Sequence, residues 1–167
     1  MNTAELLTDG FGRVRELVAS TAQGLSAEQL AQRPNGTGNS IAWLLWHIGR
    51  GEDEQVAAAA GSEPVYTAQG FAQRFDLPFP DSAHGYGMSS ADVDKVRVED
   101  PQLLVDYYDA VHARTVEYLS GMKDADLDRV VDENWNPPVT LGVRLISVLG
   151  DVTQHIGQAA YARGILS

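Results

Sequence analysis

Apolar residues recur at the three- and four-residue spacing of amphipathic helices in four stretches of the chain. Residues suited to helix ends flank these stretches: Pro101 fits a first helical turn, Thr140 is a helix cap, and Gly164 fits the left-handed position after a helix. No stretch alternates apolar and polar residues over the length of a strand, so no sheet is predicted. The pattern predicts an all-α four-helix bundle, with helices over residues 3–22, 41–60, 101–122 and 140–164.

The expected core follows from the same spacing, because each helix turns one apolar stripe toward the others. In the first helix this stripe consists of Leu6, Phe11, Val14, Leu17 and Val18.

Two connections between the helices carry aromatic residues. Residues 61–100 have no clean period and mix prolines and glycines with large apolar side chains, which are Phe71, Phe75, Phe79, Tyr86 and Met88. Such a long connection is uncommon unless topology or function requires it, and a crossover between parallel second and third helices would account for it. Trp135, in the acidic connection over residues 123–139, is expected to pack as well.

Composition narrows the classes of function. The chain has 167 residues, a length typical of one domain over residues 1–167. It carries 12 Lys and Arg against 23 Asp and Glu, and the formal charge of −11 disfavours nucleic acids and anionic membranes as partners. Neither a secretory signal nor an apolar run of membrane length is visible, so a cytoplasmic protein is expected. Because there is no Cys, thiolate ligands and cysteine nucleophiles from the protein itself are excluded.

Three side chains form a candidate metal site. His47 lies at the edge of the apolar stripe of the second helix, and Asp151 and His155 form an i, i+4 pair on one side of the fourth. Two imidazoles and one carboxylate from facing helices can hold Zn²⁺ or another divalent ion and leave a coordination position open, as catalytic sites do. The same spacing also fits a solvated Asp–His pair and a hydrogen-bonded histidine at the core edge, and spacing alone leaves both interpretations open.

Two motifs bear on this choice. They are NSIAWLLWHIGRGEDE at residues 39–54 and GDVTQHIGQAAYARG at residues 150–164. Together they resemble the DinB/YfiT-like superfamily, and the resemblance extends over most of the chain. It implies an up-down-down-up four-helix bundle with a metal bound by one His of the second helix and an HxxxH pair of the last helix, often followed by Gln.

The match to the ligand set of this family is incomplete at one position. His47 and His155 match the first and last ligands, and Gln158 matches the trailing Gln. Asp151 stands where most members have His. The mycothiol-dependent maleylpyruvate isomerase branch has Glu there, so a carboxylate remains compatible with a metal site.

The resemblance also implies a chemistry. Characterised relatives use low-molecular-weight thiols such as mycothiol, bacillithiol or glutathione, which implies a metal-dependent thiol S-transferase or a thiol-dependent isomerase, with zinc or nickel as the metal and a homodimer as the assembly. A divalent cation deprotonates a coordinating thiol and makes it a strong nucleophile. Without Cys, the chain would take this thiol from a small molecule and combine it with an electrophilic substrate. Some bundles of this family have no known reaction, so a non-catalytic metal- or ligand-binding protein is the alternative.

Four further residues are candidates for the surroundings of the metal: Trp46, Glu54, Arg144 and Gln158. Arg144 lies two turns before the carboxylate ligand and can bind a carboxylate of the thiol or the substrate. Three of them also have an ordinary explanation: Arg144 as a solvated or ion-paired group, Glu54 as part of a solvated helix face, and Gln158 as an exposed side chain. The acidic run over residues 52–54 is typical of a solvated helix face.

Overall fold

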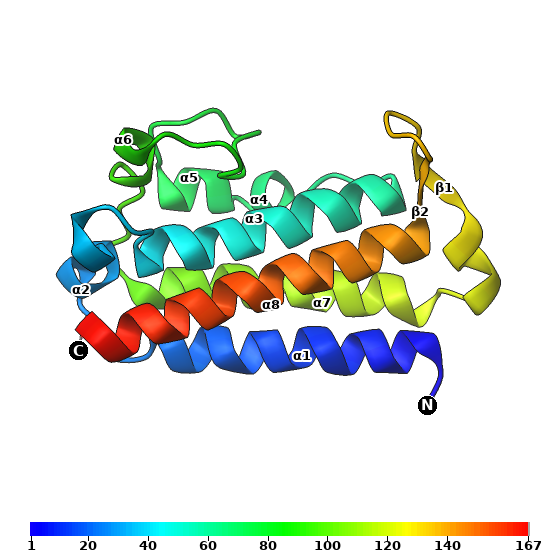
Figure 1. Cartoon of the computed structure of the whole chain (residues 1–167), viewed down its shortest axis with the longest axis horizontal. Coiled ribbons are helices and arrows are strands. Elements are labelled where there is room, and N and C mark those ends of the chain that lie inside the picture. Colours follow the sequence, from blue (N-terminus) through cyan, green and yellow to red (C-terminus); the bar gives the residue numbers. More distant parts are fainter. Residues whose placement is uncertain (167) are drawn as a thin grey trace.

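Four long helices form most of the molecule (Figure 1). The structure, a computed structural model, describes residues 1–166. The long helices are α1 (Thr3–Ala22), α3 (Ile41–Ala60), α7 (Pro101–Ser120) and α8 (Leu141–Leu166). α1 and α3 each pack against both α7 and α8, so the predicted all-α bundle is confirmed. No helix within residues 1–166 is long and apolar enough to cross a membrane.

The long helices run up, down, down and up along the bundle. α1 and α8 point one way and α3 and α7 the other, so α3 and α7 are parallel neighbours (Figure 1). Residues 61–100 must therefore travel back along the bundle, and they do so through three short helices, α4 (Val65–Ala68), α5 (Phe71–Phe75) and α6 (Ser90–Val93). Phe71 and Phe75 contact the ring of Tyr107 on α7, which packs this crossover onto the bundle.

Local signals in the sequence determine where the helices begin and end. The side chain of Asn2 accepts a hydrogen bond from the backbone N–H of Glu5 at 2.8 Å, and the Glu5 carboxylate accepts one from the Asn2 N–H at 2.9 Å. The hydroxyl of Ser40 caps α3 through the N–H of Trp43 at 3.1 Å. Gly61, with a φ of +66°, ends α3 in the left-handed conformation.

Several boundaries differ from the prediction. α7 ends at Ser120, and α8 continues through Gly164 to Leu166, because the backbone of this glycine stays helical. Between α7 and α8 lie the 3₁₀ turn η2 (Asp124–Asp128) and the antiparallel strands β1 (Val130–Asp132) and β2 (Val139–Thr140). Strands this short contain too few residues for alternation to be recognised. The remaining elements are α2 (Ala27–Ala31) and η1 (Pro34–Gly36).

Some apolar side chains expected inside lie at the surface. Leu6 and Leu17 are 58% and 45% exposed, and Leu7 is buried in their place. Successive residues of a helix are rotated by about 100°, so a shift of one position moves a side chain out of the core. Trp135, between β1 and β2, is 65% exposed rather than packed.

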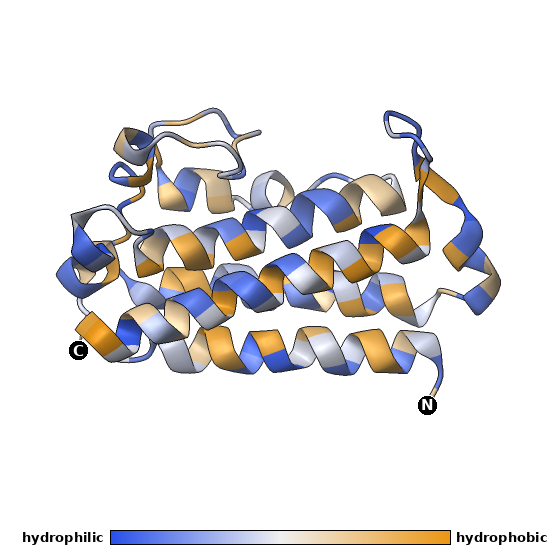
Figure 2. Cartoon of the chain, in the orientation of Figure 1, coloured by the Kyte–Doolittle hydropathy of each residue, from blue (hydrophilic) through white to orange (hydrophobic). Residues whose placement is uncertain are grey.

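The middle of α3 combines hydrophilic residues with deep burial. Figure 2 shows hydrophilic positions along this helix, and Arg50, Glu52 and Asp53 are buried. The solvated face predicted for residues 52–54 is therefore wrong for Glu52 and Asp53, whose carboxylates point into the bundle.

Candidate metal centre

His47 is buried on α3, one turn after Trp43, and its ring stacks on the Trp43 indole with centroids 4.6 Å apart and planes 15° apart. Its Nδ1 lies 2.5 Å from the backbone oxygen of His84. A carbonyl oxygen only accepts hydrogen bonds, so Nδ1 carries the hydrogen, and the neutral ring keeps its lone pair on Nε2. This Nε2 lies 3.9 Å from Oδ2 of Asp151.

His155 is held in the same tautomer by its own helix. Its Nδ1 donates to the backbone oxygen of Asp151, one turn earlier in α8, at 2.9 Å. The lone pair of the neutral ring is therefore again on Nε2. The rings of His47 and His155 meet edge to face, with centroids 4.7 Å apart.

The three predicted ligands converge. One ligand atom from each of His47, Asp151 and His155 lies within 4.8 Å of the other two. Two atoms bound to Zn²⁺ at about 2.1 Å in a tetrahedron are about 3.4 Å apart, so small side-chain rotations bring these atoms to coordination distance. The Asp151 side chain is 49% exposed and free to make such a rotation. Two imidazole nitrogens and one carboxylate are also a donor set that suits zinc and nickel, so the residues fit a divalent metal.

His47 and Asp151 have the charges that a metal ligand requires, whereas His155 must lose a proton before it can bind a metal. Burial lowers the pKa of His47 and keeps its ring neutral. The hydrogen bond from His155 lowers the pKa of Asp151, and the same interaction raises the pKa of His155. Asp151 and His155 thus favour an ion pair, with Oδ1 3.4 Å from Nδ1. A divalent cation would place positive charge beside the same carboxylate and use both Nε2 lone pairs.

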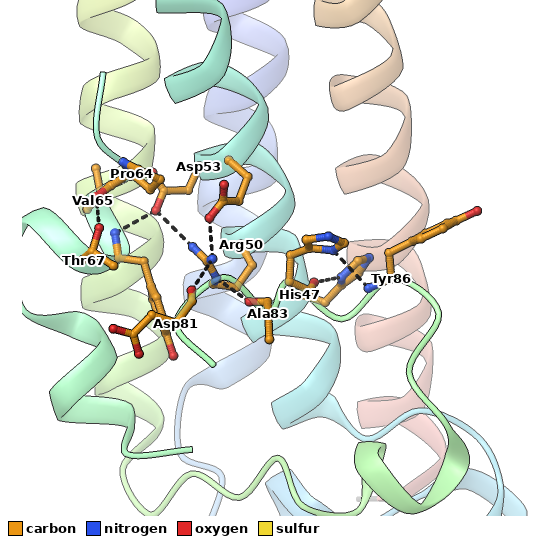
Figure 3. A network of polar contacts seen from close by, with 12 residues as sticks. His47, Arg50, Asp53, Pro64, Val65, Thr67, Asp81, Ala83 and Tyr86 are labelled. Atoms are coloured by element: carbon orange, nitrogen blue, oxygen red, sulfur yellow. Dashed lines mark hydrogen bonds and ion pairs between the residues drawn. The ribbon is translucent and has the colours of Figure 1, made fainter. Parts of the chain in front are cut away.

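The crossover forms one wall of this centre (Figure 3). Arg50 donates from Nε to the backbone oxygen of Ala83 at 2.9 Å and from Nη2 to that of Asp81 at 2.8 Å. These bonds hold the segment beside α3, where the carbonyl of His84 reaches the imidazole of His47.

Gly85, the next residue of the crossover, lies against the rings of His47 and Trp43. A Cβ at this position would lie 2.7 Å from Nδ1 of His47 and 3.1 Å from the Trp43 ring, and the φ of +96° disfavours any other residue. One sign of this contact is visible in the sequence: glycines stand at positions 85 and 87 inside an aromatic-rich connection.

Comparisons with known proteins show the family and the fold of this chain. Residues 11–159 match the sequence pattern of the DinB superfamily. The chain belongs to the DinB superfamily. It is similar to a conserved protein from Enterococcus faecalis of known crystal structure, with 34% identity, coverage of 98% of this chain and 96% of that chain, and a TM-score of 0.91. No protein with a curated description gives a significant match. The family resemblance inferred from the two motifs is thus confirmed.

A hollow of about 360 Å³ adjoins two of the three candidate ligands of this DinB bundle, His47 and Asp151. It is bordered by α3, α8 and the crossover, and its lining residues are His47, Gly51, Glu54, Gln55, His84, Tyr86, Arg144, Ser147, Val148 and Asp151. A larger hollow, of about 680 Å³, lies where α1 ends and α7 begins and contains none of the candidate ligands. The smaller hollow is therefore the space in which a ligand could reach a metal.

Two of the four other candidates line this hollow. Glu54 accepts a hydrogen bond from Nη2 of Arg50 at 2.5 Å. Arg144 donates from Nη2 to Oδ2 of Asp132, on β1, at 2.7 Å. Both side chains are thus held by charged neighbours beside the candidate metal centre.

The structure does not bring the other two to the hollow. Trp46 is 1% exposed and packs near Phe79, with ring centroids 6.5 Å apart. It precedes His47 by one residue, and the helical rotation of about 100° turns it into the core. Gln158 is exposed on α8 and is not among the residues that line the hollow.

A second polar cluster on α3 was missed by the sequence analysis. The hydroxyls of Tyr108 and Thr115 donate to the two oxygens of Glu52 at 2.5 and 2.7 Å, and burial raises the pKa of Glu52 to about 7. Asp53 accepts from the Tyr107 hydroxyl at 2.9 Å and from two backbone N–H groups of α4 at 2.7 and 2.8 Å. These carboxylates bind α7 and the crossover to α3, which is a structural role.

Proposed function

We propose that this protein is a divalent-metal-dependent enzyme that attaches a low-molecular-weight thiol to an electrophile or uses such a thiol in an isomerisation. The observation that carries the proposal is the pair of imidazoles, each with its lone pair on Nε2, that converge with a carboxylate at the edge of a hollow. Membership of the DinB superfamily supports it.

His47, Asp151 and His155 would hold the ion, with zinc or nickel as the metals that suit this donor set. Three protein ligands leave room for a fourth from outside the protein. A cation held there lowers the pKa of a coordinating thiol, so that a thiolate is available at neutral pH. The chain has no Cys, so the reacting sulfur comes from a small molecule.

The residues around the ligands keep them oriented and provide space for the reactants. The His84 carbonyl and the Trp43 indole fix the plane and tautomer of His47. A hollow of about 360 Å³ is within the usual size range of small-molecule sites. In the transfer, sulfur loses its proton and forms a bond to carbon. With an epoxide as electrophile, the ring C–O bond breaks and its oxygen takes up a proton.

Metal analysis of the untagged protein tests the first half of the proposal. After incubation with Zn²⁺ and desalting, we expect about one equivalent in the wild type and little in the His47→Ala/His155→Ala double variant. His112→Asn is the matched control, because His112 lies on α7 and does not line the hollow. Equal, substoichiometric metal in the wild type and the double variant would contradict the site.

A conjugation assay tests the second half. Metal-loaded protein is incubated with mycothiol, bacillithiol or glutathione and a chromogenic electrophile, and formation of the thioether is followed by absorbance. We expect turnover with at least one thiol, dependent on the metal and absent from the double variant.

A non-catalytic metal- or ligand-binding role is the second candidate. The contact between Asp151 and His155 is already a favourable ion pair without a metal, so the cluster also suits a purely structural polar group. Stoichiometric metal binding without turnover of any of the three thiols would favour this role.

A further inference from the structure

The sulfur atom of Met88, in the crossover, lies beside the candidate metal centre. Nε1 of the Trp43 indole donates a hydrogen bond to Sδ of Met88 at 3.4 Å. Trp43 is 6% exposed, and this is the one hydrogen bond that its indole nitrogen makes among the described residues. The same indole stacks on the ring of His47. A single aromatic ring therefore separates the sulfur from a candidate ligand.

The backbone of Met88 is bound to the same wall of the centre. Its N–H donates to the carbonyl oxygen of Gly85 at 3.1 Å, which closes a turn over residues 85–88. Gly85 lies against His47, where an added Cβ would be 2.7 Å from Nδ1. A displacement of Met88 therefore acts on His47 in two ways, through the Trp43 ring and through this turn.

Met88 is accessible to a small oxidant. It is partly exposed, and its neighbours Gly87 and Ser89 are exposed. The chain has two other methionines, Met1, which is 90% exposed, and Met122, which follows the end of α7. The end of α7 and the start of α3, where Trp43 lies, are at opposite ends of the bundle (Figure 1). Met88 is thus the methionine whose chemical state can affect the metal centre.

Peroxides convert the thioether of methionine into a sulfoxide. With hydrogen peroxide, the sulfur gives an electron pair to one oxygen, the S–O bond forms and the O–O bond breaks. The other oxygen leaves as water with both protons, so the sulfur is oxidised by two electrons and the peroxide is reduced. Methionine sulfoxide reductases reverse the change with two electrons from thiols and release the oxygen as water.

The contact between Met88 and Trp43 has no room for the added oxygen. An oxygen that accepts the hydrogen bond from Nε1 at about 2.9 Å forces the sulfur farther away than the present 3.4 Å, by roughly 0.5–1 Å. An oxygen that points elsewhere places a polar group among the core side chains on which Met88 packs. Either arrangement moves Met88 relative to the Trp43 ring.

We propose that Met88 is a reversible oxidation site for peroxides, and that its sulfoxide shifts Trp43 and the turn over residues 85–88 and so weakens metal binding by His47. This inference rests on the metal-binding half of the proposed function and requires neither the thiol nor the reaction.

Zinc titration of the metal-free protein before and after treatment with hydrogen peroxide tests the inference. Desalting removes the peroxide, and mass spectrometry of peptides identifies the oxidised methionines. We expect the zinc affinity of the wild type to fall about tenfold, the size of effect that follows when the support of a metal-binding histidine is lost. Treatment with methionine sulfoxide reductases, followed by desalting, should restore the affinity.

Three variants sharpen the test. Met88→Leu keeps an apolar side chain of similar size without sulfur, so peroxide should change its zinc affinity less than about twofold. Met122→Leu is the matched control, because it removes another partly buried methionine, and it should keep the tenfold loss. Met88→Gln carries a permanent polar group and should bind zinc more weakly than the wild type before any treatment, without a further response to peroxide.

Near-ultraviolet circular dichroism of the metal-free protein adds a measurement that does not depend on zinc. Peroxide should change the aromatic signal of the wild type and of Met122→Leu, because the surroundings of Trp43 change. The signal of Met88→Leu should stay the same.

The outcomes separate the two proposals. If Met88 is oxidised and zinc affinity is unchanged, or if Met88→Leu loses as much affinity as the wild type, the inference is overturned and the proposed function stands. The same holds if peroxide oxidises Met1 and leaves Met88 intact. If the untreated wild type binds no zinc, the proposed function is overturned and the inference with it.

Discussion

Two polar clusters on α3 differ in how their acceptor atoms are used. Around Glu52 and Asp53, hydroxyl and backbone donors occupy the carboxylate oxygens, and neither residue lines any of the hollows described above. Around His47, protein atoms bind only Nδ1, and Nε2 faces Asp151 across 3.9 Å beside a hollow. A complete set of internal hydrogen bonds indicates a structural role, whereas a lone pair left for an outside partner indicates a ligand site.

Arg50 connects the two clusters. It lies 3.7 Å from Oδ2 of Asp53 on one side and holds the crossover segment of Asp81 and Ala83 on the other. Its guanidinium also lies 4.1 Å from the ring centroid of Tyr66. We call the group around Glu52 and Asp53 the closed cluster and the group around His47 the open cluster. Changes at or near Arg50 test whether the two clusters depend on each other.

The largest expected effect comes from Arg50→Met. The variant leaves the buried carboxylate of Asp53 without its cation and frees the crossover, so we expect a loss of about 3–5 kcal/mol and a melting temperature lower by about 10 °C. Zinc affinity should fall as well, because the His84 carbonyl is no longer held against His47. Circular dichroism melts and zinc titrations measure the two effects. Arg74→Met, which breaks the exposed pair with Asp106, should cost less than about 1 kcal/mol.

The second effect concerns pH and isolates the closed cluster. The pKa of Glu52 is raised from 4.5 to about 7, so the folded protein retains a proton that the unfolded chain releases, and stability falls as pH rises between these values. Glu52→Gln removes this dependence. It should resemble the wild type at pH 5 and be more stable at pH 8 by up to about 3 kcal/mol. Urea unfolding at both pH values measures the stability difference between the wild type and Glu52→Gln. A difference that is the same at pH 5 and pH 8 would contradict the titration of Glu52 between these values.

The smallest effect concerns the wall of the open cluster. Gly85→Ala introduces a Cβ at 2.7 Å from Nδ1 of His47, and we expect zinc affinity to fall about tenfold. Gly87→Ala is the control, because its φ of +73° is equally unfavourable for alanine but no atom lies within 4 Å of the added Cβ. Each variant should lose about 1 kcal/mol of stability through backbone strain. Equal zinc affinity in the two variants would show that the crossover does not orient His47.

Helical periodicity was sufficient to predict the four long helices and to place the three candidate ligands near the core. The place of Arg144 beside the hollow could be predicted from its position on the same helix as Asp151. The two residues are seven apart, which is close to two helical turns, so they lie on the same face. The sequence analysis placed Trp46 near the metal because it is adjacent to His47, which lines the hollow. One step along a helix rotates a side chain by about 100°, so Trp46 lies in the core instead.

The burial of Glu52 and Asp53 could not be predicted from the sequence for a different reason. Their partners come from α7 and α4, and a hydrophobic pattern counts a carboxylate as a surface residue whatever hydroxyl or backbone N–H lies opposite. The contact between the crossover and His47 was hidden because its acceptor is a backbone carbonyl, which every residue possesses.

The distribution of the candidate ligands along the chain has a consequence for protein synthesis. A nascent polypeptide that extends only through α7 contains His47 but neither Asp151 nor His155, which are both on α8. Such a fragment cannot assemble the three-residue set while it is still on the ribosome. If a metal binds at this centre, its uptake is restricted to chains in which the last long helix has been made and has docked between α1 and α3.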